Sequence, residues 1–122
     1  MAKVVLVIED DIYMRDVLVA KLTKEGFTVF EAIDGSVGLD MTAQKKPDLV
    51  VLDIILPIMN GFDYLEAKAK VSAIANIPVI ILSNLGQRED VERGMKLGAK
   101  DYLVKAHFTP NDLMVKVRSY IG

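Results

Sequence analysis

Short runs of apolar residues recur along the chain. Four of them are clear and one is weaker; the clear runs are 3–9, 47–56, 77–83 and 101–106, and the weaker one is 27–32. The first three are nearly continuous in Val, Ile and Leu and do not alternate with polar residues. Strands that are buried on both faces have this pattern, whereas half-exposed strands alternate. The runs therefore predict the strands of a sheet that is covered on both sides.

The segments between these runs have the spacing of amphipathic helices. In residues 12–25, apolar residues recur every four positions, and Gly26 follows as a C-terminal cap. Residues 110–121 come after Thr109, a favourable N-cap residue, and begin with a proline. Weaker or shorter helical patterns cover the segments 35–45, 61–71 and 87–97.

Strands and helices thus alternate five times. This order predicts right-handed crossovers and a parallel sheet with helices on both faces. Five such strands fit a doubly wound α/β fold of the flavodoxin-like (βα)5 type, with strand order 2-1-3-4-5 and a switch point between the first and third strands. Because 122 residues are the size of one domain, we predict a single domain over residues 1–122.

Composition is typical of a globular protein. Hydrophobic residues make up 52% of the chain and charged residues 26%, which argues against disorder. The absence of cysteine excludes disulfides and thiolate metal sites. No apolar stretch approaches the roughly 20 residues of a membrane span. Lysine and arginine are scattered and the net charge is −2, so no basic patch indicates nucleic acid. We therefore expect a cytoplasmic protein without direct contact to membrane or nucleic acid.

Polar residues stand at the carboxyl ends of the predicted strands. Glu9 and Asp10 end the first strand, and Asp53 lies within the apolar run 47–56. Ser83 ends the fourth strand and Lys105 stands at the end of the fifth. In a parallel sheet these ends meet at one edge, where ligands bind. Each residue alone could be an ordinary loop or turn residue, but their gathering at one edge favours a site.

Asp53 and Asp11 differ in the role that their sequence surroundings indicate. Asp53 lies between apolar triplets, where burial disfavours a charge and no basic residue is near in sequence. Asp11 directly precedes the helix over 12–25, so we interpret it as the N-cap of that helix. Asp53 is therefore the stronger candidate for chemistry.

Three carboxylates in one pocket need a cation to offset their repulsion. Oxygen ligands without His or Cys suit a hard ion such as Mg²⁺, which would leave Asp53 ionised as a nucleophile. Carboxylates attack phosphorus to form acyl phosphates. The ammonium of Lys105 and the hydroxyl of Ser83 would then meet the charge that develops on the phosphoryl group.

With these residues in place, the chain resembles the receiver domains of two-component response regulators, the chemotaxis-regulator-like family. The resemblance extends over essentially all 122 residues. The matching stretches, in order, are VIEDD with Arg15 after it, DIILPIMNG, VIILS ending at Ser83, and GAKDYLVK. Each stretch alone is modest, but the ordered set with its spacings is specific.

The resemblance implies a phosphorelay function. Asp53 would accept a phosphoryl group from the phosphohistidine of a sensor histidine kinase or phosphotransfer protein. Mg²⁺ would be bound by Asp10, Asp53 and the backbone carbonyl of Ile55, with Glu9 acting through water. Lys105 would contact the phosphoryl group. The protein would catalyse its own phosphorylation and dephosphorylation in a bacterial cytoplasm without being a turnover enzyme.

The resemblance also implies a conformational switch. Ser83 would be the switch hydroxyl, and Tyr102 the switch aromatic that turns inward when Ser83 moves toward the phosphate. The signal would be read on the surface formed by the helix over 87–97, the strand over 101–106 and the helix over 110–121. Its partner there would be an output domain, a downstream protein or a second copy of the chain.

Three features depart from the family pattern. The family usually has proline with a cis peptide bond after the lysine; here Ala106 follows Lys105. We predict a trans bond, because a non-proline cis bond costs about 2.5–4 kcal/mol. The following segment looks one residue longer than usual, with His107, the only histidine, as a loop residue in the extra space. Asn84 follows Ser83 where a small residue is common.

The lifetime of an aspartyl phosphate depends on groups that orient the attacking water. By the family pattern, the residues that flank the path of this water are Ile55 and Leu85. Neither can hold a water by hydrogen bonding, and we expect Asn84 to face away. This predicts a long-lived phosphoprotein; the alternative is that Leu85 points into the core and leaves the path open.

Other functions fit less well. A phosphatase or phosphotransferase of the haloacid-dehalogenase kind would have a second aspartate at position 55, which is isoleucine here. A docking or dimerisation receiver that is not phosphorylated would lack an acid or Lys105, and none is missing. A nucleotide-binding protein would have a glycine-rich loop after the first strand, which EDDIYMR does not provide. A stand-alone receiver and a domain of a larger regulator or hybrid kinase both stay open.

Overall fold

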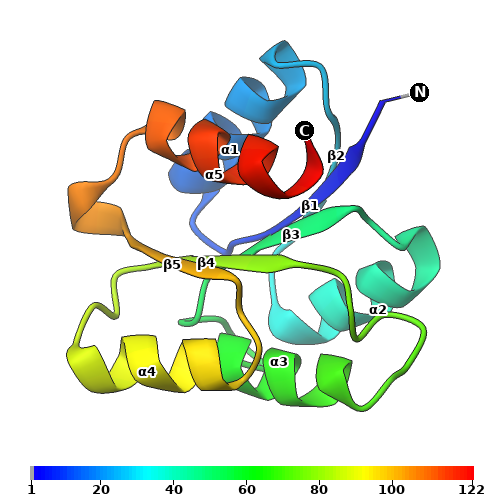
Figure 1. Ribbon diagram of the computed structural model, residues 1–122, viewed down its shortest axis with the longest axis vertical. Coiled ribbons are helices and arrows are strands. Elements are labelled where there is room, and N and C mark those ends of the chain that lie inside the picture. The colour runs from blue at the N-terminus through cyan, green and yellow to red at the C-terminus, as the bar shows by residue number, and fades with distance from the viewer. Residues whose placement is uncertain (1) are drawn as a thin grey trace.

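The fold is a parallel sheet between two layers of helices (Figure 1). A computed structural model describes residues 2–122. The strands are β1 (Val4–Ile8), β2 (Thr28–Ala32), β3 (Leu49–Leu52), β4 (Val79–Ser83) and β5 (Asp101–Val104). The helices are α1 (Ile12–Lys24), α2 (Gly35–Lys45), α3 (Gly61–Ala69), α4 (Arg88–Lys96), the short 3₁₀ turn η1 (Lys105–His107) and α5 (Pro110–Ile121).

The order of the strands confirms the fold that the sequence predicts. All neighbouring strands pair in parallel, in the order β2-β1-β3-β4-β5. Helices α1 and α5 cover one face of the sheet, and α2, α3 and α4 cover the other (Figure 1). The three central strands β1, β3 and β4 are therefore buried on both faces, which is why their sequences do not alternate.

Successive residues of the central strands serve two separate cores. In β1, Leu6 and Ile8 belong to a core with α3, whereas Val5 and Val7 belong to a core with α1 and α5. All four side chains are fully buried. Because side chains in a strand point alternately to opposite faces, a continuous apolar run is what a strand between two helical layers requires.

The predicted helix ends are also observed. Asp11 caps α1, where its Oδ1 accepts hydrogen bonds from the backbone N–H groups of Tyr13 and Met14. Thr109 caps α5 in a reciprocal capping box. Gly26, with φ of 97°, follows α1 in a left-handed conformation that favours glycine. Between residues 2 and 122, no helix has the length and apolar character to cross a membrane.

Two strands end two or more residues before their apolar runs do. The run 47–56 continues past the end of β3, because the chain turns after Leu52 into the loop that leads to α3. There the N–H of Ile54 donates a hydrogen bond to the Asp53 carboxylate, so it does not pair with a neighbouring strand. The run 101–106 is cut at Val104, where η1 begins. Both strands therefore end where the polar residues of the candidate site begin.

Gly61 fixes the loop between β3 and α3. Its N–H donates to the carbonyl oxygen of Ile54 at 2.9 Å. A Cβ atom at Gly61 would lie 2.6 Å from the backbone oxygen of Asp53 and 2.7 Å from the Cα of Ile54. These are backbone atoms of the loop that carries Asp53, so they cannot move aside as the end of a side chain can.

We expect Gly61→Ala to lower the free energy of unfolding by about 1–3 kcal/mol, as overpacking does. Urea unfolding measures the loss. Gly86→Ala is the matched control, because the atoms nearest to a Cβ there belong to the Val104 side chain, the first two at 3.0 and 3.1 Å. Equal losses in the two variants would show that the backbone contact at Gly61 has no special role.

Candidate functional site

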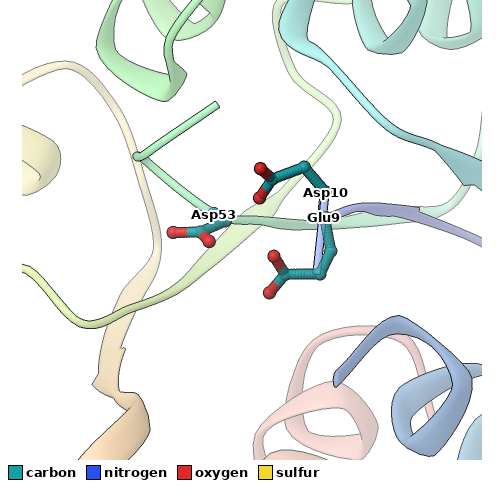
Figure 2. A group of neighbouring side chains, drawn as sticks. All are labelled: Glu9, Asp10 and Asp53. Carbon is teal, nitrogen blue, oxygen red and sulfur yellow. The ribbon is translucent and has the colours of Figure 1, made fainter. Parts of the chain in front are cut away.

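Three carboxylates meet at the carboxyl edge of the sheet. Glu9, Asp10 and Asp53 each offer an oxygen atom, and these atoms lie within 4.8 Å of one another (Figure 2). Glu9 and Asp10 follow β1, and Asp53 follows β3, which is its neighbour in the sheet. The N–H of Asp53 donates to the carbonyl oxygen of Ile8 at 3.0 Å, which continues the ladder by one step. The pairing of two strands therefore brings together acids that are far apart in sequence.

Lys105 supplies the positive charge inside this cluster. Its Nζ lies 2.6 Å from Oε1 of Glu9 and 2.8 Å from Oδ2 of Asp53. Burial lowers the pKa of Lys105, but the hydrogen bonds to Asp53 and Glu9 outweigh it and the pKa is raised, so the side chain is an ammonium ion. Lys105 thus lies between two of the carboxylates that the sequence places at this edge of the sheet.

The chain after β5 begins with a trans peptide bond and a 3₁₀ turn. The Lys105–Ala106 peptide bond is trans, as predicted, since residues 2–122 contain no cis bond. Residues 105–107 form the 3₁₀ turn η1. His107 is exposed in this turn and lines a groove beside α5, not the acidic cavity, so its interpretation as a loop residue is confirmed.

The cluster carries more negative charge than Lys105 can balance. Glu9 is almost fully buried, with an exposed fraction of 2%. Its burial raises the pKa of Glu9 to about 7; the hydrogen bond from Lys105 opposes this shift, and the charge of Asp53 adds to it. A site with three carboxylates, one ammonium and only oxygen ligands fits a hard divalent cation.

Asp53 is held from both sides. Its Oδ1 accepts hydrogen bonds from the N–H groups of Ile54 at 2.6 Å and Ile55 at 3.3 Å, and its Oδ2 accepts from Lys105. The carboxylate borders a cavity of about 200 Å³. The residues that line this cavity are Glu9, Asp10, Asp11, Asp53, Ile55, Asn84 and Lys105. A buried carboxylate in a fixed orientation thus faces a space for a small ligand.

Ser83 and Tyr102 meet at the loop after β4. Ser83 is completely buried, and its Oγ accepts a hydrogen bond from the N–H of Leu85 at 3.3 Å. The hydroxyl of Tyr102 donates to the carbonyl oxygen of Leu85. The Tyr102 ring lies against α4, where a Cβ at Gly94 would be 3.1 Å from it. Burial raises the pKa of Tyr102 to about 12, so it remains a hydrogen-bond donor.

The positions of Asn84 and Leu85 in this loop correct the prediction that Ile55 and Leu85 shield the phosphoryl group from water. Asn84 lines the acidic cavity, whereas Leu85 does not line it and packs against the core instead. The hydrogen bonds from Leu85 to Ser83 and from Tyr102 to Leu85 fix the backbone of Leu85 on the core side. The expectation that Asn84 faces away is therefore wrong. Of the two predicted shields only Ile55 lines the cavity, and it is 55% exposed.

Arg15 is a neighbour of the site whose role the sequence did not reveal. Its guanidinium donates to the backbone carbonyl oxygens of Glu9 and Asp10 and to the carboxylate of Glu31. The sequence shows the arginine but not these partners. Every residue has a backbone carbonyl, so the residue types do not indicate which carbonyls the arginine binds. Its place one turn after the cap residue Asp11, on the helix that follows the acids, was the available signal.

Comparisons with known proteins agree with this geometry. The family model for the response regulator receiver domain matches residues 5–118. The DNA-binding dual master transcriptional regulator RpaA of Synechocystis is 35% identical over 117 residues, which are 96% of this chain and 48% of that protein. The chain thus spans about half the length of the curated relatives it matches.

Solved structures show the same similarity. The chemotaxis protein CheY4 of Vibrio cholerae has a TM-score of 0.90 at 27% identity, with 98% of this chain and 99% of that chain covered. The beryllofluoride-activated receiver domain of RstA from Klebsiella pneumoniae has a TM-score of 0.88 at 26% identity, with 97% of each chain covered.

The buried Glu9 yields a pH-dependent prediction. Its pKa in the folded protein, about 7, lies above the ordinary value of 4.5. The ionised carboxylate therefore destabilises the fold, and the free energy of unfolding falls as pH rises from 4.5 through 7. With divalent cations removed by a chelator, Glu9→Gln should be more stable than wild type at pH 8, by about 1–3 kcal/mol.

Urea unfolding between pH 4 and pH 8 measures this difference. The gain in Glu9→Gln should disappear below pH 4.5, where the wild-type carboxyl is neutral as well. Glu66→Gln, at an exposed position of α3, is the control and should show no such trend. A loss of stability in Glu9→Gln at pH 8, or a gain that does not depend on pH, would contradict the account of this carboxylate.

Proposed function

Because the chain belongs to the response regulator receiver domain family, we propose that it is a switch controlled by phosphorylation of Asp53. The donor would be the phosphohistidine of a sensor histidine kinase or phosphotransfer protein. The observation that carries this proposal is the position of the Asp53 carboxylate. It is 5% exposed, it is fixed by two backbone N–H groups and by Lys105, and it borders a small acidic cavity.

The acidic cluster supports Mg²⁺ as the cofactor. The donors are carboxylate oxygens, with no nitrogen or sulfur ligand among them, and their charge exceeds that of Lys105. Asp10, Asp53 and the backbone carbonyl of Ile55 would hold the ion, and Glu9 would act through water. When bound, the ion would screen the carboxylates from one another and offset the charge of the incoming phosphoryl group.

In the phosphoryl transfer, the chain mainly has to position the Asp53 carboxylate and the charges around it. An oxygen of Asp53 forms a bond to phosphorus while the bond from phosphorus to the donor nitrogen breaks. The electron pair of that bond stays on the imidazole, which takes up a proton from water. Lys105 contacts Asp53 at 2.8 Å and would meet the negative phosphoryl oxygens. The receiver is then a signalling protein that modifies itself and is not a turnover enzyme.

Ser83 and Tyr102 would carry the signal to the surface. The Oγ of Ser83 accepts from the N–H of Leu85, so its hydroxyl proton is free to be donated to a phosphoryl oxygen. A shift of Ser83 would move Leu85, which is also bonded to Tyr102 of β5. The surface of α4, β5 and α5 would then change its affinity for an output domain, a downstream protein or a second copy of the chain.

The relatives are the basis for our proposal about what this receiver controls. RpaA is named as a DNA-binding regulator, and this chain covers 48% of it. We propose that the present chain itself does not bind DNA, since its basic residues are scattered, and that DNA contact belongs to the remaining half of such regulators. Like the kinase that would address it, the chain would act in a bacterial cytoplasm.

The phosphoacceptor can be tested by mass. Acetyl phosphate with Mg²⁺ should add one phosphoryl group to the wild-type chain, and Asp53→Asn should abolish this addition. The matched control is Asp40→Asn, which changes an exposed aspartate of α2 and should be labelled like the wild type. Intact-mass spectra that show equal labelling of Asp53→Asn and wild type would refute the assignment of Asp53.

The switch can be tested with beryllofluoride, a phosphoryl mimic that activates the receiver domain of RstA. In the wild-type chain, NMR shifts should extend from the acidic cavity to α4 and β5, along a population shift toward the active state. In Ser83→Ala they should remain near Asp53, because the hydroxyl that would join the phosphoryl group to Leu85 is missing. Wild-type shifts confined to the cavity would count against the proposed readout.

A further inference from the structure

Asp10, a ligand in the proposed cation site, lacks the packing that holds its neighbours. Glu9 and Asp53 are buried, at 2% and 5% exposure, and both are bonded to Lys105. Asp10 is exposed, and its carboxylate makes no hydrogen bond or ion pair within residues 2–122. The direction of its side chain therefore depends on the backbone on either side of its Cα.

Arg15 holds that backbone by hydrogen bonds. The Nη1 of Arg15 donates to the carbonyl oxygen of Glu9 at 3.0 Å and to that of Asp10 at 3.4 Å. These two carbonyls belong to the peptide units before and after the Cα of Asp10. The N–H of the second unit, that of Asp11, donates to Oε2 of Glu9 at 3.2 Å. Both peptide planes that orient Asp10 are thus fixed by side chains.

Arg15 is itself anchored. Its Nε donates to Oε1 of Glu31 on β2 at 3.1 Å, and its side chain is only 14% exposed. A guanidinium presents several N–H donors in a rigid plane, so it can bond a carboxylate and two carbonyls at once. A lysine at this position offers one nitrogen on a flexible chain and cannot reproduce the arrangement.

We infer that Arg15 is a positioning residue for the cation site, which it supports by orienting Asp10 through the carbonyls of Glu9 and Asp10. The inference rests on the proposed Mg²⁺ site. Residues that orient a metal ligand without touching the metal typically change its affinity by about 10–100-fold when they are replaced. Since Arg15 acts through the backbone, an effect on the order of tenfold is expected here.

The sign of the effect separates positioning from plain electrostatics. Arg15 is a cation beside a cation site, so its charge alone repels Mg²⁺. If charge were its only influence, Arg15→Met would bind Mg²⁺ more tightly than the wild type. If Arg15 positions Asp10, Arg15→Met binds Mg²⁺ more weakly. Arg15→Lys keeps the charge and loses the planar contacts, so it should also bind more weakly.

The experiment is a Mg²⁺ titration of each purified variant, followed by calorimetry or by NMR of the Asp10 and Asp11 amides. The expected result is a dissociation constant raised on the order of tenfold in Arg15→Met and Arg15→Lys. Glu31→Gln keeps an acceptor for Nε and both carbonyl bonds, so it should stay near the wild type. Arg88→Met removes an exposed arginine of α4 that pairs with Glu92, and it should change nothing.

Unchanged or tighter Mg²⁺ binding in both Arg15 variants would overturn the inference. Urea unfolding of each variant shows whether it is folded; if Arg15→Met is not, Arg15→Lys decides alone. A wild-type chain that binds no Mg²⁺ would overturn the cofactor in the proposed function. A wild type that binds, together with Arg15 variants that bind equally well, would overturn only the role of Arg15.

Discussion

The repulsion among three carboxylates around a single ammonium governs the carboxyl edge of this sheet. Because β1 and β3 are neighbours, the carboxylates of Glu9 and Asp10 lie close to the carboxylate of Asp53. Lys105 offsets part of the charge through contacts of 2.6 and 2.8 Å, yet burial still raises the pKa of Glu9 to about 7. This arrangement does not stabilise the fold by itself, and it fits the cation and the phosphoryl group of the proposed function.

The surrounding loops hold this edge in place by local hydrogen bonds. Asp53 is fixed by the N–H groups of the two residues that follow it, and Gly61 lets the chain pass close behind them. On the other side, Ser83 and Tyr102 both bond to Leu85. The two sides differ in kind. The acid side is fixed by hydrogen bonds around Asp53, whereas the loop after β4 joins a buried hydroxyl to an outer strand, as the proposed switch requires.

The fold could be predicted because its signals are local and repeated. Continuous apolar runs indicate doubly covered strands, and Asp11, Gly26 and Thr109 mark helix ends by residue type alone. The meeting of acids and Lys105 followed from one rule, that parallel strands end at one edge. Strand ends were less predictable, because apolar residues such as Ile54 stay buried in the loop beyond the ladder. The positions of Asn84 and Leu85, and the partners of Arg15, depend on backbone contacts that residue types do not encode.

We propose that the acidic edge is short of positive charge until a divalent cation binds. The most direct test of this proposal is urea unfolding of the wild-type chain at pH 8, with Mg²⁺ and with a chelator in its place. A ligand that binds only the folded state raises the free energy of unfolding. The account predicts a clear increase with Mg²⁺ that is much smaller in Asp10→Asn. An equal free energy of unfolding with and without Mg²⁺ would contradict it.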